Sequence, residues 1–380
     1  MSAEAPIPFN RPSFGPAAFE HIRAVIASGE TCGDRALSRR CEAQLAEITG
    51  SARVFLTPSC TAALEMAALL LGVTAGDEVI VPSFTFTSSA NAFALLGARP
   101  VFVDSRPDTL NLDAEKLDAL VTPRTKAIVA VHYAGVGCDM ETVMAVAARH
   151  GLAVVEDNAH GLMGAWQGRA LGSFGALSTA SFHETKNLAC GEGGALFVNE
   201  PSLVERAEVV REKGTNRTRF LRGEVDKYSW VDRGSSWLMP DLLAAVLLDQ
   251  LERRREIQSA RAACWNTYAR ELRAWADGRG VTLPTVPAGA EHPSHLFWLA
   301  FATERDATAF RAHLRARGIL AVHHYVPLHL STVGRSYGGR EGDCPVVEEV
   351  AMRLVRLPLF ASMTASELAR VVEGCLAFGA

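Results

Sequence analysis

Four short segments of the sequence carry the residue types that chemistry at a binding site needs. The first, Pro58–Leu64 (PSCTAAL), follows an apolar run and begins with small and hydroxyl-bearing residues. Small residues at the start of a helix let backbone N–H groups approach an anion, and the helix dipole favours negative charge there. The segment therefore suits a phosphate, with a plain helix cap by Ser59 or Thr61 as the alternative.

A carboxylate and an imidazole follow a second apolar run. Asp157 comes directly after Ala153–Glu156 (AVVE), and His160 lies three residues further on. A carboxylate at the end of a buried strand needs a partner, because an unpaired charge there is costly. A protonated heteroaromatic nitrogen is one suitable partner, and a set of backbone amides is the other. His160 lies within reach of the same ligand, although by itself it fits a polar packing residue equally well.

A lysine and a cluster of glycines form the third segment. Lys186 ends the run Ser181–Lys186 (SFHETK), and Gly191–Gly194 (GEGG) follows closely. A lone lysine after a strand is usually a solvated surface residue, but the glycines indicate unusual backbone angles or close approach to a ligand. A lysine held in such a site can form a Schiff base with a carbonyl compound.

The fourth segment, Ser83–Thr87 (SFTFT), places aromatic side chains after the run Glu78–Val81 (EVIV). An aromatic ring there can stack on a flat cofactor, and core packing is the alternative. Together the four segments offer an anion cradle, a carboxylate for a ring nitrogen, an aromatic for a ring face and a lysine for an aldehyde. Pyridoxal 5′-phosphate carries all four complementary groups.

The elements that must position these residues lie between positions 50 and 200, where short β-branched apolar runs alternate with helical patterns. This alternation predicts an α/β fold with a large doubly wound domain, whose mostly parallel sheet is covered on both faces. Ligands bind such sheets outside the carboxyl ends of the strands, where the four segments fall. The expected strands are 53–56, 78–81, 100–103, 126–131, 153–156, 176–182 and 195–198. The expected helices are 61–71, 88–96, 113–121, 140–150 and 202–213.

Beyond residue 213 the alternation ends. We expect a loop rich in arginine, glycine and aromatics over 214–240, and then one long helix over 241–274 that bridges two domains. A small C-terminal α+β domain follows, with its elements expected at 295–302 (strand), 306–317 (helix), 319–325 (strand) and 364–377 (helix). The predicted division is a cofactor-binding large domain with an N-terminal arm over 1–250, and a bridging helix with the small domain over 251–380.

Composition excludes several classes of protein. The 380 residues include 38 Lys and Arg against 42 Asp and Glu, so a strongly basic nucleic-acid binder is not expected. A hydrophobic fraction of 48% argues against disorder, and the apolar stretches are too short to cross a membrane. Eight cysteines without a C-x-x-C pair, and no leader pattern, predict a cytoplasmic enzyme without a zinc ribbon.

The order and spacing of these motifs resemble the DegT/DnrJ/EryC1 family of sugar aminotransferases, which are fold-type I pyridoxal-phosphate enzymes. The shared motifs include IPFNRP (7–12), SCTAAL (59–64), PSFTF (82–86), EDNAHG (156–161), SFHETKN (181–187), GEGG (191–194), HYVPLH (324–329) and LPLF (357–360). Within the family, REKGTNR (211–217), VDKYSW (225–230) and GSSWLM (234–239) resemble the transaminases that form dTDP-4-amino-4,6-dideoxygalactose. The resemblance implies dTDP-4-dehydro-6-deoxy-D-glucose as acceptor and L-glutamate as donor, in surface polysaccharide synthesis.

The resemblance also implies roles for individual residues. Lys186 would bind the cofactor aldehyde and move protons, Asp157 would pair with the ring nitrogen, and His160 would contact the phenolic oxygen. Phe86 would stack on the ring, and Ser236 stands where the family has an Asn that reaches the neighbouring subunit's phosphate. A homodimer with shared active sites is therefore implied. The other phosphate-side residues are Cys60, Thr61, Ala62 and Ser181, and the expected substrate-binding residues are His183, His329, Lys227 and Arg217.

Three alternatives remain beside this prediction. The first is an aminotransferase for another nucleotide keto-sugar, with a C3 ketone or a different nucleotide. The second is a catalytically idle cofactor-binding regulator, against which the retained Lys186 and Asp157 argue. The third is a metal hydrolase built on His323, His324 and His329, which is disfavoured because adjacent residues of a predicted strand point to opposite faces. No metal is therefore expected.

Overall fold

The computed structural model describes residues 5–379, and a seven-stranded sheet forms its centre. The strand order is β1-β9-β8-β5-β4-β2-β3; the neighbours from β8 to β3 pair in parallel, whereas β9 is antiparallel to both β1 and β8. The predicted mostly parallel α/β sheet is confirmed. The strands are β1 (Arg53–Thr57), β2 (Glu78–Pro82), β3 (Arg99–Val103), β4 (Thr125–Val131), β5 (Ala153–Asp157), β8 (Leu177–Ser181) and β9 (Gly194–Val198).

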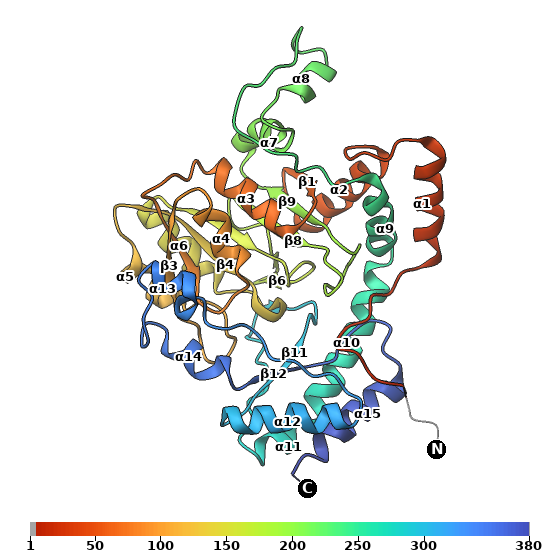
Figure 1. Ribbon diagram of the computed structural model, residues 1–380, viewed down its shortest axis with the longest axis vertical. Coiled ribbons are helices and arrows are strands. Elements are labelled where there is room, and N and C mark those ends of the chain that lie inside the picture. The colour runs from red at the N-terminus through yellow and green to blue at the C-terminus, as the bar shows by residue number, and fades with distance from the viewer. Residues whose placement is uncertain (1–4, 380) are drawn as a thin grey trace.

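Helices cover both faces of this sheet (Figure 1) because its strands bury apolar side chains on both sides. In β2, Val79 and Val81 belong to the core under α3, whereas Ile80 belongs to the core under α6. Successive residues of a strand thus serve opposite layers. The helices of this region are α3 (Cys60–Leu70), α4 (Ser88–Ala94), the 3-10 turn η1 (Ala114–Lys116), α5 (Leu117–Leu120), α6 (Met140–His150), η3 (Pro201–Leu203) and α7 (Val204–Arg211).

The prediction of one continuous helix over 241–274 is wrong, because the segment forms three consecutive helices. The chain forms α9 (Asp241–Glu252), α10 (Arg254–Glu271) and α11 (Arg273–Asp277), with breaks at Arg253 and Leu272. The first break has a packing reason. The apolar side of α9 lies in the core of the large domain, whereas Cys264 and Tyr268 of α10 lie in the core of the small domain.

Two N-terminal helices, which the sequence did not predict, pack near α9 (Figure 1). They are α1 (Pro16–Ser28) and α2 (Ala36–Thr49), and both contact α9. Arg35 precedes α2 without a side-chain cap, so Asp241 of α9 supplies it by accepting the N–H groups of Leu37 and Ser38 at 3.1 and 3.2 Å. The extended arm before α1 reaches the other domain, since Ile7 pairs with Ile319 and lies in the small-domain core.

The small domain contains a two-stranded antiparallel sheet, which lies between the large sheet and helices α12 and α15 in Figure 1. The predicted strand over 319–325 is wrong, because this segment makes only single bridges, Ile7 with Ile319 and Val322 with Arg356. Two different partner segments and a positive φ at Tyr325 prevent a continuous ladder. The elements here are β11 (Phe297–Ala300), α12 (Glu304–Ala316), α13 (Thr332–Ser336), α14 (Pro345–Ala351), β12 (Leu354–Leu357) and α15 (Ala365–Leu376).

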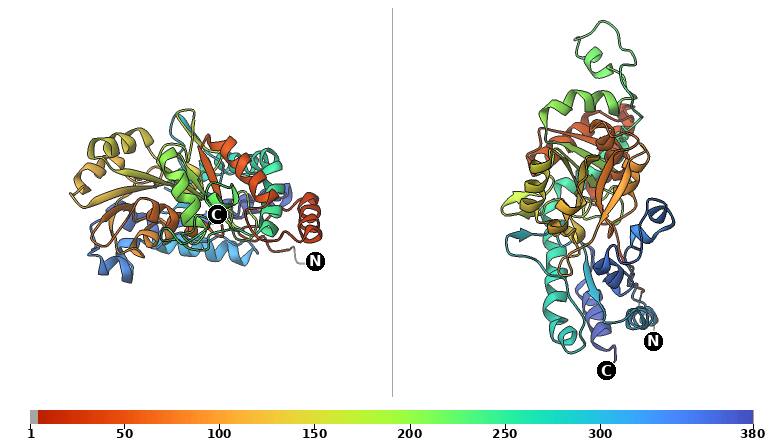
Figure 2. Two further views of the ribbon diagram at one scale, coloured as in Figure 1. Left: turned by 90° about the horizontal axis from the view of Figure 1, so that it is seen from above. Right: turned by 90° about the vertical axis from the view of Figure 1, so that its left-hand side faces the viewer.

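Two smaller features complete the architecture. A three-stranded sheet joins β10 (Ala290–Glu291), β6 (Ala165–Trp166) and β7 (Arg169–Ala170). The segment that contains α8 (Arg217–Leu221) extends away from the rest of the chain in Figures 1 and 2. Among the helices of residues 5–379, none is both long and apolar enough to span a membrane.

Candidate active site

A cavity of about 830 Å³ lies at the carboxyl ends of the parallel strands, between the two domains. The position agrees with the general rule for ligand sites of open α/β sheets. The structure brings together most of the predicted site residues, because the strands β5 and β8 and the helix α3 all present their ends here. The predicted residues that line the cavity are Cys60, Thr61, Phe86, Asp157, His160, Ser181, His183 and Lys186.

The amino end of α3 provides the anion-binding side of the cavity. Ser59 caps the helix by accepting the N–H of Ala62 at 3.1 Å, so this N–H is already used. The predicted residue Ala62 is buried and does not line the cavity. Cys60 and Thr61 are the first helical residues, whose N–H groups have no intrahelical acceptor. A Cβ on Gly194 would lie 2.4 Å from the Cys60 nitrogen, so only glycine permits this close approach of β9. Capping and anion binding are thus compatible here.

Asp157 ends β5 and is only 5% exposed. Its Oδ2 accepts the hydroxyl of Ser89 at 2.7 Å, and its Oδ1 accepts the N–H of Ala159 at 3.2 Å. Ser89 in turn lies 2.8 Å from the Thr85 hydroxyl. The carboxylate is therefore oriented by neutral donors while it still lines the cavity, as pairing with a protonated ring nitrogen requires. Sequence reasoning missed Ser89, which lies on α4 far from Asp157 in sequence.

His160 presents an unpaired polar atom. Its Nδ1 is buried without a hydrogen-bond partner in the described chain, and its ring lies 4.2 Å from that of His295 between centroids. Burial lowers the pKa of His160 well below its usual value, with Lys186 and Arg356 adding to the effect. A neutral imidazole with an orphaned nitrogen beside Asp157 indicates a polar ligand atom at this position.

Lys186 lies after β8 in a turn whose backbone N–H donates to the carbonyl of His183 at 2.9 Å. Burial lowers the pKa of Lys186 from 10.5 to about 8, opposed by the nearby Cys60 and Asp157. A larger fraction of neutral amine is therefore present near neutral pH than on an exposed lysine. Neutral lysine is the form that attacks a carbonyl carbon.

Comparison with known proteins assigns the chain to a family. Residues 14–375 match the DegT/DnrJ/EryC1/StrS aminotransferase family. The chain belongs to this family. It is 33% identical over 376 residues to the spore coat polysaccharide biosynthesis protein SpsC of Bacillus subtilis (strain 168). The matched region covers 97% of this chain and 95% of SpsC.

Two solved structures are similar over the whole aminotransferase. TlmJ from Streptoalloteichus hindustanus is 32% identical over 98% of both chains, with a TM-score of 0.89. S. venezuelae DesV, solved in complex with a ketimine intermediate, is 32% identical over 98% of both chains, with a TM-score of 0.88. The predicted family and the fold-type I architecture are confirmed, and the enzyme is a sugar aminotransferase with pyridoxal 5′-phosphate as cofactor.

The residues present fit this cofactor. The N–H groups at the start of α3 suit its phosphate, the anchored carboxylate of Asp157 suits its ring nitrogen, and the orphaned Nδ1 of His160 suits its ring oxygen. Phe86 is 58% exposed, and its ring lies 6.5 Å from that of Tyr325, so the aromatic pair borders the cavity without being closed into the core. His183 also lines the cavity, with Nδ1 2.9 Å from the hydroxyl of Thr185.

The predicted role of His329 in substrate binding does not fit its position in the aminotransferase. The side chain is fully buried, its Nδ1 lies 2.5 Å from Ser83 Oγ, and its Nε2 lies 3.0 Å from Glu348 Oε1. His329 therefore links a loop of the large sheet to α14 and does not line the cavity. These contacts also argue against a metal site built on His323, His324 and His329. Both ring nitrogens of His329 already contact Ser83 and Glu348, and Nδ1 of His324 lies 2.9 Å from the hydroxyl of Tyr133.

Three other predicted residues lie outside the cavity of their own chain. Arg217, Lys227 and Ser236 are exposed and belong to the segment between α7 and α9, part of which extends outward in Figure 1. Ser236 forms a single bridge with Glu212 at the base of this segment. A role for these residues at a cofactor site requires a second copy of the chain.

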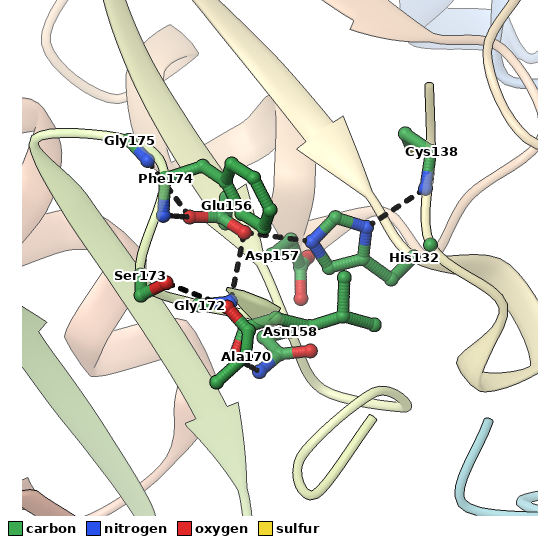
Figure 3. A network of polar contacts seen from close by, with 12 residues as sticks. His132, Cys138, Glu156, Asp157, Asn158, Ala170, Gly172, Ser173, Phe174 and Gly175 are labelled. Atoms are coloured by element: carbon green, nitrogen blue, oxygen red, sulfur yellow. Dashed lines mark hydrogen bonds and ion pairs between the residues drawn. The ribbon is translucent and has the colours of Figure 1, made fainter. Parts of the chain in front are cut away.

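Glu156, directly before Asp157, is the centre of a buried network that sequence reasoning missed (Figure 3). Its two carboxylate oxygens accept the N–H groups of Gly172, Phe174 and Gly175 at 2.6–2.8 Å. The side chain is completely buried. These contacts attach the loop before β8 to the end of β5, and hence to the strand that carries Asp157.

His132 completes the same network from the end of β4. The N–H of Cys138 donates to His132 Nδ1 at 3.2 Å, so Nδ1 carries no proton and Nε2 is the donor. His132 Nε2 lies 2.9 Å from Glu156 Oε2, and the backbone N–H of His132 donates to the carbonyl of Asp157 at 3.3 Å. Two adjacent parallel strands are thereby held in register at the floor of the site.

Replacing Glu156 with glutamine should weaken cofactor retention despite the equal size of the side chains. Every contact to the carboxylate comes from an N–H donor, so an amide NH₂ group would meet another N–H group. We expect a cost of about 1–3 kcal/mol, seen as a lower melting temperature and about tenfold weaker cofactor binding in a dialysis titration. Glu205→Gln, at an exposed ion pair, is the control. Unchanged cofactor affinity in Glu156→Gln would contradict this positioning role.

The lowered pKa of Lys186 predicts the pH dependence of cofactor attachment to the apoprotein. Only the neutral amine attacks the aldehyde, and its fraction rises with pH through a pKa of about 8. The rate of covalent attachment, followed by visible absorption after rapid mixing, should therefore rise with pH and reach half of its maximum near pH 8. A rate that continues to rise toward the ordinary lysine pKa of 10.5 is the opposite result.

Proposed function

We propose that this aminotransferase transfers the amino group of L-glutamate to C4 of a dTDP-linked 4-keto-6-deoxy sugar. The acceptor would be dTDP-4-dehydro-6-deoxy-D-glucose and the product dTDP-4-amino-4,6-dideoxy-D-galactose, used for surface polysaccharide. The observation that carries the amino-transfer part is that the partly buried Lys186, whose pKa is lowered, lines one cavity with Asp157 and His160. The name of SpsC supports a role in polysaccharide synthesis, and the motifs of segments 211–217, 225–230 and 234–239 support the choice of sugar.

The chemistry divides between the cofactor and the chain. When bound, pyridoxal 5′-phosphate would supply a ring that accepts electrons as the donor α-carbon loses its proton. The amine of Lys186 would take the proton from the donor α-carbon and later deliver one to C4 of the sugar. Asp157 would keep the ring nitrogen protonated, because Ser89 and Ala159 hold its carboxylate in a fixed orientation at the cavity wall. The start of α3 holds the phosphate.

We infer a homodimer with shared active sites from the segment between α7 and α9. Tyr228, Trp230 and Val231 are 55%, 78% and 55% exposed in the single chain, which is unusual for three neighbouring apolar residues. A second copy that covers them would bring Ser236 to its partner's phosphate and Arg217 and Lys227 to its partner's sugar nucleotide. All eight cysteines are free thiols, which is consistent with our proposal of a cytoplasmic enzyme.

Incubating the purified enzyme with L-glutamate and dTDP-4-dehydro-6-deoxy-D-glucose tests this function. We expect 2-oxoglutarate and a 4-amino sugar whose C4 configuration, determined by NMR coupling constants, is that of galactose. Lys186→Ala should lose at least about a thousandfold in rate, because no other group in the cavity replaces the amine. Amination at C3, or turnover only with another nucleotide, would contradict the choice of substrate. Turnover retained in Lys186→Ala would contradict the mechanism.

A further inference from the structure

Arg356 is a cation in the cavity wall to which neither the family motifs nor the sequence reasoning gave a role. It lies on β12, opposite Trp298 of β11, and lines the same cavity as Lys186. One nitrogen, Nη2, donates to the carbonyl of His323 at 3.0 Å, and the guanidinium carbon lies 4.6 Å from the centroid of the Phe9 ring. Its Nε is buried without a hydrogen-bond partner in the described chain.

No carboxylate compensates this charge. Two carboxylates line the cavity, but Asp157 is bonded to Ser89 and Ala159, and Glu192 lies 3.8 Å from His183. Across residues 5–379, no carboxylate oxygen lies within 4.0 Å of an Arg356 nitrogen. A guanidinium whose Nε–H group is buried without a partner is costly unless an anion completes its contacts. The structure therefore provides for an anion that is not part of the chain.

The neighbours of Arg356 leave this anion few other partners. Burial lowers the pKa of His160, His295 and His324 well below the usual histidine value, so these imidazoles are neutral at physiological pH. Lys186 is the other cationic side chain of the cavity lining, and it is committed to the cofactor. A charged contact in this part of the cavity must therefore come from Arg356.

We propose that Arg356 binds the α-carboxylate of the amino-acid donor, an inference that rests on the proposed aminotransfer. A planar guanidinium with free N–H groups matches a carboxylate with two parallel hydrogen bonds. The same contact holds the α-carbon in a defined orientation, so that its C–H bond lies within reach of the Lys186 amine. Neutral Phe9, stacked on the guanidinium, keeps the group from turning away from the cavity.

The distance of each anionic group from the reacting carbon of its substrate favours the α-carboxylate over the diphosphate as the ligand of Arg356. The α-carboxylate is attached directly to the carbon that loses its proton to Lys186. The diphosphate is attached at C1, across the sugar ring from the C4 carbon that reacts. Arg356 and Lys186 line the same cavity, and the charge of Arg356 also helps to lower the pKa of that lysine, so both side chains act on the part of the cavity where the donor α-carbon would lose its proton.

The variants Arg356→Gln and Arg356→Lys test this inference in the holoenzyme. Rapid mixing with L-glutamate, followed by loss of the visible cofactor band, gives the apparent Kd of the donor. We expect Arg356→Gln to raise this Kd about 10- to 100-fold, which is the worth of a hydrogen-bonded charge pair, and Arg356→Lys to raise it less. The Kd of 2-oxoglutarate, measured by calorimetry, should rise in parallel. Arg305→Gln, exposed on α12 of the same domain, is the control and should change neither value.

The outcomes separate this inference from the proposed function. If the wild-type enzyme reacts with L-glutamate and Arg356→Gln shows the same donor Kd within about twofold, only the inference is wrong. If the variant weakens the nucleotide sugar and leaves the donor unchanged, Arg356 binds the diphosphate and the inference is also wrong. If L-glutamate has no effect on the wild type, L-glutamine, L-aspartate and L-alanine carry the same α-carboxylate and replace it in the test. A wild-type enzyme that reacts with none of them overturns both proposals.

Discussion

A buried carboxylate, whose contacts all come from N–H donors, secures the end of the strand that carries Asp157. Glu156 and Asp157 are neighbours in β5, and successive side chains of a strand point in opposite directions. Glu156 therefore turns away from the cavity and binds the loop of residues 172–175 and His132, while Asp157 turns toward it. The first side chain secures the backbone from which the second acts.

The charges of the cavity are few and each has a separate task. The chain as a whole has a formal net charge of −4, so no general positive field attracts the phosphate, carboxylate and diphosphate groups that the enzyme must bind. Local groups replace that field. The N–H groups at the start of α3 suit the phosphate, Lys186 the aldehyde, and Arg356 an anion near the reacting carbon, while buried imidazoles stay neutral between them.

The large sheet and the core of the site could be predicted because both depend on local signals. Buried parallel strands appear as short apolar runs, and polar residues directly after such runs, Asp157 and Lys186 among them, fall at one edge of the sheet. Helix α2 was missed because its cap comes from Asp241, far away in sequence. The strand over 319–325 was wrong because its pairing depends on two separate segments. His329 was misassigned because sequence cannot tell a histidine bonded inside the core from one that faces a cavity.

Chemical trapping locates the residue that holds the cofactor. Borohydride reduction of the holoenzyme fixes the cofactor on the amine that holds it, and mass spectrometry of the peptides identifies that residue. The structure predicts a single label on Lys186, because it is the one lysine among the described residues that line the cavity. A label on Lys116, Lys126, Lys213 or Lys227 in place of Lys186, or no label at all, would contradict the account.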